Sequence, residues 1–186
     1  DNVAHKIEAY LHTKGVDTLF GAGLSSIEHK ENGKMAVCFG ETVVDADVVV
    51  LCIGTRANTG VVDPEEVAVN RGIVVDDHMK TSAPGIYAAG GCCEGANIQT
   101  GNTQIIGLWA NAGYQGRTAG ANMAGKPEKY RGNIIHNITH FMDIDFISYG
   151  NNQAQGVVHE YLSEDENMYI KAIVSEDGVS CVNILD

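Results

Sequence analysis

The alternation of apolar and polar residues predicts a helix at the start of the chain. Within residues 3–14, Val3, Ile7 and Leu11 recur at helical spacing. Gly15 follows where a glycine that caps a helix C-terminus belongs. We therefore expect an amphipathic helix of about three turns.

Short strands are expected after this helix. Their apolar and β-branched residues cover 17–21, 24–30 and 35–39. Asn32-Gly33 predicts a hairpin turn between the second and third of these strands. Residues 47–54 then form a continuous apolar run, which is typical of a parallel strand buried on both faces.

A strand, a glycine turn and a helix are expected in succession between residues 81 and 126. Residues 71–76 predict a short strand that precedes them, and residues 85–89 predict the strand of the succession itself. Gly90-Gly91 predicts the turn, and small and apolar residues at helical spacing predict a helix over residues 104–123. This order brings backbone N–H groups and a helix N-terminus to a polar ligand, so it predicts a cofactor site.

Alternating strands are expected beyond Pro127. They cover residues 134–139, 145–149, 156–162, 168–175 and 179–185. The turn Glu176-Asp177-Gly178 joins the last two as a hairpin. An antiparallel sheet with an open edge needs covering, which favours a dimer or strand exchange.

Composition and charge narrow the class of protein. The chain has 186 residues, of which 44% are hydrophobic and 19% are charged, as in a globular protein. A net charge of −12 argues against nucleic-acid binding, and no apolar run is long enough to span a bilayer. The five cysteines follow no disulfide pattern, which fits a reducing cytoplasm. Because the chain starts at Asp1 and ends within an expected strand, we expect it to be a piece of a longer protein.

Two segments carry a resemblance to a known family. They read IYAAGG, followed by Glu94, and then GLWANAGYQGRTAGANMAG, which ends at Gly125. This combination resembles the second flavin-binding segment of the FAD-dependent pyridine nucleotide-disulfide oxidoreductases. Within that family it is most similar to the NADH:rubredoxin and nitrite reductase-like branch. The resemblance covers nearly the whole chain and is strongest over residues 81–126.

The resemblance implies an α/β fold that becomes α+β in its C-terminal part. Residues 1–59 would be the closing half of a Rossmann-like NAD(P)-binding domain, with Gly54 opening a loop at the cofactor. Residues 60–127 would be the returning segment of a Rossmann-like FAD-binding domain. Residues 128–186 would start a mainly antiparallel β domain that forms a dimer interface.

The resemblance also implies the residues that contact the flavin. Gly90, Gly91 and Glu94 would lie in the turn that binds it, and Leu108 and Trp109 would lie nearest its pyrimidine ring. A lone tryptophan on a helix is often a core residue instead, so both alternatives stay open for Trp109. The family has an aspartate at the position of Gly91, and losing its hydrogen bonds weakens binding by roughly 1.5–3 kcal/mol.

The implied function is that of a cytoplasmic flavoprotein oxidoreductase with FAD and NAD(P)H as cofactors. Hydride would pass from the nicotinamide to the flavin, and electrons would pass to a rubredoxin-like protein, a disulfide or oxygen. A homodimer is implied. We expect the isolated chain to be inactive and to bind FAD weakly or not at all. The alternative is a binding or scaffold module in which the flavin site has decayed.

Other candidate sites have simpler explanations. Cys92-Cys93 would suit a thiol redox centre or a soft metal, but two small residues filling a loop explain the pair better. His136 and His140 lie on one expected strand, roughly 13 Å apart, which is too far for a shared metal. Residues 21–26 approximate a dinucleotide fingerprint but lead into a hairpin rather than a helix. We therefore predict no catalytic residue and no metal ligand in this chain.

Overall fold

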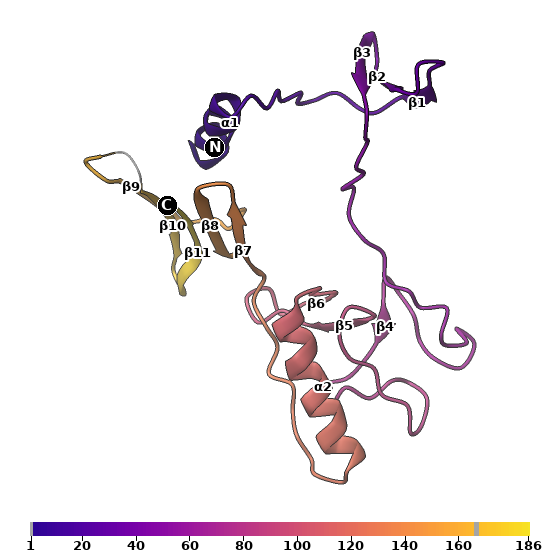
Figure 1. Cartoon of the computed structure of the whole chain (residues 1–186). Coiled ribbons are helices and arrows are strands. Elements are labelled where there is room, and N and C mark those ends of the chain that lie inside the picture. Colours follow the sequence, from indigo (N-terminus) through magenta and orange to yellow (C-terminus); the bar gives the residue numbers. More distant parts are fainter. Residues whose placement is uncertain (1, 166–167) are drawn as a thin grey trace. The chain divides into compact units, whose positions relative to one another are not determined.

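The computed structural model describes residues 2–165 and 168–186 (Figure 1). It divides into two compact units, one that runs to Thr55 and one from Arg56 to Asp186. The domain boundaries expected from the sequence, at residues 59 and 127, stay predictions.

The first unit begins with helix α1, Asn2–Thr13, as predicted. Gly15 ends it with a φ of +76°, a backbone conformation that glycine adopts at little cost. The Gly15 N–H donates to the His12 carbonyl, and the Val16 N–H donates to the Leu11 carbonyl, both at 3.0 Å. The last carbonyls of the helix are therefore satisfied by the cap.

Three antiparallel strands follow in the first unit. Strands β1 (Ser26–His29), β2 (Met35–Phe39) and β3 (Thr42–Ala46) pair in the order β1-β2-β3. Gly33, with a φ of +81°, lies in the predicted turn between β1 and β2. Strands β1 and β2 confirm the pattern read from residues 24–30 and 35–39, β3 was not expected, and residues 17–21 form no strand.

The apolar run at residues 47–54 is not a strand in the structure. The prediction of a parallel strand buried on both faces is wrong for this chain, because Val48, Val50 and Ile53 are exposed by 75%, 76% and 87%. Such a strand requires neighbouring strands and covering helices. None of the described residues pairs with this segment in a sheet.

The second unit starts with a small sheet and the longer helix. Strands β4 (Ile73–Val74), β5 (Cys93–Ala96) and β6 (Thr103–Gln104) pair in the order β4-β5-β6, and helix α2 spans Trp109–Met123. The β4–β5 pair is parallel and the β5–β6 pair is antiparallel. Strands β5 and β6 were not expected from the sequence.

Two elements predicted from the sequence differ from those in the structure of the second unit. Residues 85–89 form no strand beyond a single bridge between Lys80 and Tyr87. The helix expected from residue 104 begins at Trp109, because Thr103 and Gln104 pair with β5 instead. Local sequence spacing does not reveal such a pairing, because a strand of two residues is too short to show a period of its own.

A buried cluster joins the small sheet to α2. Its members are Val67, Ile73, Met79, Ala88, Cys93, Ala119 and Tyr130. Met79 is fully buried with a φ of +62°, which is unusual for a residue other than glycine. The Asp76 side chain stabilises this turn, because its Oδ1 accepts the N–H groups of His78 and Lys80 at 2.8 and 2.9 Å.

A five-stranded antiparallel sheet forms the C-terminal part of the second unit. Its strands are β7 (His136–Phe141), β8 (Ile144–Gly150), β9 (Val157–Leu162), β10 (Tyr169–Ser175) and β11 (Gly178–Leu185). They pair in the order β7-β8-β11-β10-β9, so the last strand in sequence is central (Figure 1). The expectation of helices and mixed strands followed by an antiparallel sheet is confirmed.

Candidate functional site

The glycine turn after Ala89 packs closely on helix α2. Gly90 is buried and has a φ of +88°. Its N–H donates to Oε1 of Gln115 at 2.7 Å. A Cβ at Gly90 would lie 3.4 Å from the Cβ of Ala112 on the helix. The backbone conformation therefore favours glycine here, and an added Cβ would touch Ala112.

Gly91 lies next in the turn and differs from Gly90 in each respect. It is exposed, its φ lies outside the left-handed region, and a Cβ there would meet nothing within 4 Å. Open space therefore stands where the resemblance expects an aspartate that contacts the flavin.

The N-terminal end of α2 carries the two residues expected to face the flavin ring. Leu108 is half-buried at the N-cap, and no side chain caps the helix. Trp109 is 96% exposed, so the alternative that it packs in the core is wrong for this chain. The uncapped N–H groups and the positive end of the helix dipole are available to an electron-rich group.

Glu94 is used within the protein. It is only 5% exposed, and its Oε1 accepts the N–H groups of Arg71 and Gly72 at 2.9 and 3.0 Å. The carboxylate thus fixes the segment before β4 against β5. Its contact with a cofactor stays a prediction, as do the cofactor contacts of the other residues named from the sequence. Gly54, in the first unit, is exposed with a φ of +92°.

Polar residues on the buried face of α2 were missed by the sequence reading. Asn111 and Gln115 are fully buried, and Thr118 is 4% exposed. Oδ1 of Asn111 accepts the Tyr130 hydroxyl at 2.6 Å and Nδ2 of Asn133 at 3.1 Å. Asn111, Gln115 and Thr118 are four and three residues apart, so they lie on one face of the helix. Polar side chains in that pattern normally indicate a face exposed to solvent, which is why the sequence did not indicate their burial.

The adjacent cysteines fit the simpler explanation given for them. Cys93 has no exposed surface, and burial, with a smaller contribution from Cys92, raises the pKa of its thiol to about 12. Its Sγ donates to the Gly90 carbonyl at 3.4 Å. A thiol in this state is a poor nucleophile and a poor metal ligand. All five cysteines are free.

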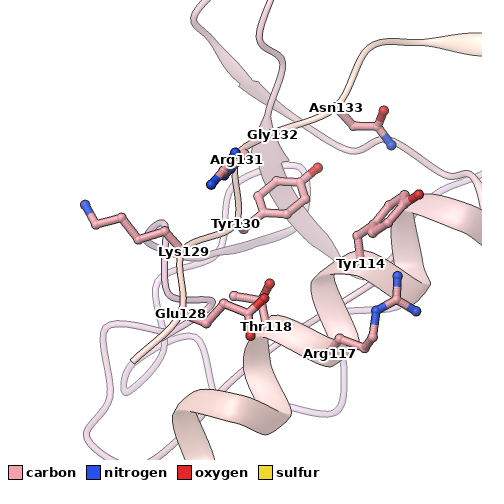
Figure 2. Close-up of a pocket in the computed structure, with 9 residues that line it drawn as sticks. All are labelled: Tyr114, Arg117, Thr118, Glu128, Lys129, Tyr130, Arg131, Gly132 and Asn133. Atoms are coloured by element: carbon pink, nitrogen blue, oxygen red, sulfur yellow. The ribbon is translucent and has the colours of Figure 1, made fainter. Parts of the chain in front are cut away.

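A pocket of about 310 Å³ lies beside α2, where the connecting segment 128–133 passes the helix (Figure 2). Arg117 lies over the Tyr114 ring, with its guanidinium carbon 4.9 Å from the ring centre. Lys129 extends away from the helix and pairs with Asp77 at 2.7 Å. The pocket has a mixed charge, since Glu128 also lines it. None of the residues named from the sequence as a flavin contact lines it.

Metal ligation finds little support among the described residues. Asp76, Asp77 and His78 bring ligand atoms within 4.8 Å of one another. However, Asp77 is already paired with Lys129 and His78, and the hydrogen bond from Lys129 is the main cause that lowers the pKa of Asp77.

The two histidines of β7 have separate partners. Nδ1 of His136 lies 3.0 Å from the Ile134 carbonyl, and Nδ1 of His140 contacts Asp145. The expectation that they share no metal stays a prediction. Within the described ranges, no helix combines the length and the apolar character that crossing a membrane requires.

Comparison with known proteins extends these observations. The chain is 28% identical over 179 residues to the NADH-dependent phenylglyoxylate dehydrogenase subunit epsilon of Aromatoleum evansii. This match covers 94% of this chain and 42% of that protein. It is 35% identical over 92 residues to the nitric oxide reductase FlRd-NAD(+) reductase of Salmonella typhi, covering 50% of this chain and 24% of the relative. The chain thus spans less than half the length of these relatives.

A solved structure shares the fold. The covalent putidaredoxin reductase–putidaredoxin complex matches with a TM-score of 0.82 and 24% identity, over 96% of this chain and 43% of the other. Residues 1–116 match the family described as pyridine nucleotide-disulphide oxidoreductase. This match covers more than half of the chain and includes the glycine turn and the start of α2. The chain therefore belongs to the pyridine nucleotide-disulphide oxidoreductase family.

Proposed function

We propose that this chain is part of an NAD(P)H-dependent flavoprotein oxidoreductase and supplies one wall of its FAD site. The observation that carries the proposal is the exposed, uncapped start of α2, with Leu108 and Trp109, next to the Gly90-Gly91 turn. A large apolar side chain that is 96% exposed beside free N–H groups is typical of a binding surface rather than of a core.

The residues present fit a flavin in two respects. The helix end offers positive potential and N–H groups to an electron-rich ring. The turn offers free space at Gly91, where no atom lies within 4 Å of a Cβ position. Bound FAD would supply the chemistry of accepting hydride from NAD(P)H and releasing electrons to an acceptor.

The role of this chain is to bind and orient. Trp109 and Leu108 would cover the ring, and the α2 N-terminus would stabilise negative charge on it. Gly54 would lie at the NAD(P)H site, and Glu94, which holds the residues before β4 against β5, would lie beside the turn that approaches the FAD. The remaining parts of both cofactor sites would come from the rest of the protein, so we expect the isolated chain to be inactive.

The acceptor is proposed to be a small rubredoxin-like redox protein. The similarity to a nitric oxide reductase FlRd-NAD(+) reductase, 35% identical over 92 residues, supports a redox protein as the acceptor. A homodimer is proposed as well, because β7 and β9 are the two edge strands of the C-terminal sheet and need covering.

The experiment is an absorption spectrum of the full-length protein after incubation with FAD and desalting. We expect weak flavin retention with Gly91 and about tenfold tighter binding after Gly91→Asp, because the new carboxylate can accept hydrogen bonds from the cofactor. Gly23→Asp is the matched control, since its Cβ position is equally open and lies in the first unit. Equal retention by both variants would contradict the proposal.

A second candidate function rests on Gly91 itself. If the aspartate position has been lost because the flavin is no longer used, the protein would act as a binding or scaffold module. In that case neither the natural protein nor Gly91→Asp would retain FAD in the same experiment.

A further inference from the structure

Gln115 links the glycine turn to helix α2 through a single buried oxygen. The side chain is fully buried, and its Oε1 accepts the Gly90 N–H at 2.7 Å. The same oxygen faces the Cys93 thiol at 3.6 Å. Because both of these groups are donors, the atom that faces them must be the amide oxygen.

The side chain of Gln115 is held tightly on its other side. A Cβ at Gly95 in β5 would lie 2.3 Å from Nε2 of Gln115, so a side chain at this position would displace the amide. The ring of Tyr130 lies against the same place, 3.1 Å from that Cβ position. Strand β5, the connecting segment and the turn therefore all restrict where the Oε1 of Gln115 can lie.

The two ends of the Gln115 amide are not equally satisfied. Nε2 is buried and makes no hydrogen bond of good geometry with a described residue, although it lies close enough to the Tyr130 hydroxyl to interact with it. Oε1 satisfies the Gly90 N–H, and an apolar side chain of similar length would leave that buried donor without an acceptor. The presence of an amide at this position is therefore best explained by the hydrogen bond that its oxygen accepts from the Gly90 N–H.

We propose that Gln115 is a positioning residue that sets the distance between the Gly90-Gly91 turn and the flavin-facing end of α2. This inference rests on the proposed function. Gly90 has the conformational freedom of glycine and is restrained by this hydrogen bond and by its contact with Ala112. Since Leu108 and Trp109 begin the same helix, the Gln115 hydrogen bond aligns the two parts of the FAD-binding wall.

The test compares Gln115→Met with Tyr130→Phe in the full-length protein. Gln115→Met keeps the length of the side chain and removes the acceptor. We expect it to weaken FAD binding about tenfold and to alter the flavin absorption spectrum. Tyr130→Phe removes the 2.6 Å hydrogen bond to Asn111 in the same buried network without touching Gly90. We expect it to keep the FAD affinity within about twofold of the natural protein while lowering the melting temperature at least as much.

Amide hydrogen exchange at Gly90, measured without FAD, reports the anchoring directly. We expect exchange to accelerate about tenfold in Gln115→Met and to stay nearly unchanged in Tyr130→Phe. Gly95→Ala, which displaces the Gln115 amide without altering it, should reproduce both effects of Gln115→Met.

Two results would overturn the inference. One is FAD affinity that follows the melting temperature across all three variants, which would indicate a purely structural role. The other is unchanged Gly90 exchange in Gln115→Met. A natural full-length protein that retains no FAD, together with accelerated Gly90 exchange in Gln115→Met, would instead overturn the proposed function while leaving the anchoring of the turn intact.

Discussion

The Cys93 thiol lies at the first residue of β5 with no exposed surface, and its environment determines its protonation. Burial removes the water that would stabilise a thiolate, so the pKa rises from the ordinary 9.0 to about 12. The folded protein therefore keeps this proton at pH values where the unfolded chain releases it.

This difference predicts a pH dependence of stability. Below about pH 9 both states are protonated, and the contribution of Cys93 is constant. As the pH rises from about 9 to about 12, only the unfolded state loses the proton, so the free energy of unfolding falls. Denaturant unfolding at several pH values should show this decrease, and Cys93→Ala should reduce it. An identical alkaline slope in the variant would contradict the assignment.

The two glycines of the turn give a second prediction at the scale of single residues. Gly90→Ala should lower the free energy of unfolding by about 1–2 kcal/mol, because alanine is strained at a φ of +88° and its Cβ approaches Ala112. Gly91→Ala should change it by less than about 0.5 kcal/mol, since its Cβ position is open. Thermal unfolding of the two variants measures the difference, and equal losses would argue against the described turn.

At the scale of elements, Glu94 connects β5 to the residues that lead into β4. Glu94→Ala would leave the buried N–H of Gly72 and the part-buried N–H of Arg71 without an acceptor, so we expect a loss of about 1–3 kcal/mol in the free energy of unfolding. Glu128→Ala, at an exposed carboxylate, is the control and should be nearly neutral. Chemical denaturation of both variants tests this, and a neutral Glu94→Ala would remove the role assigned to the carboxylate.

Elements with local signals were predictable from the sequence. Helix α1, the hairpin at Gly33 and the strands beyond residue 134 have clear periodicity and turn residues, and the structure contains them. Strands β5 and β6 were not predictable, because Cys93–Ala96 is stabilised by pairing with β4 and by the Glu94 hydrogen bonds rather than by its own composition. Tertiary context decides such short strands.

The candidate site was predictable only in part. Resemblance indicated Gly90, Gly91 and the start of α2, but Gln115 could not be identified, since a glutamine on a helix normally indicates a solvated position. Only the structure places its oxygen on the Gly90 N–H.

At the scale of the whole molecule, residues 47–54 have the composition of a buried strand but no neighbouring strand to pair with among the described residues. Most of their side chains are apolar, Val48, Val50, Leu51 and Ile53 are exposed, and the segment belongs to no sheet of the described chain. We expect the amides of this segment to exchange rapidly with solvent in this chain and at least about tenfold more slowly in the full-length protein, where strands from the remaining sequence can pair with them. Hydrogen exchange with mass spectrometry compares the two, with β2 as an internal control. Equally rapid exchange in both would contradict this view.

The position of β11 in the C-terminal sheet has a consequence for biosynthesis. This strand lies between β8 and β10, although it is the last of the five in sequence. Until residues 178–185 have emerged from the ribosome, the β7–β8 hairpin and the β9–β10 hairpin have no common neighbour. Each hairpin then exposes an edge that pairs readily with other chains. Chaperones that bind nascent chains would therefore protect this sheet most in the interval before translation passes Leu185.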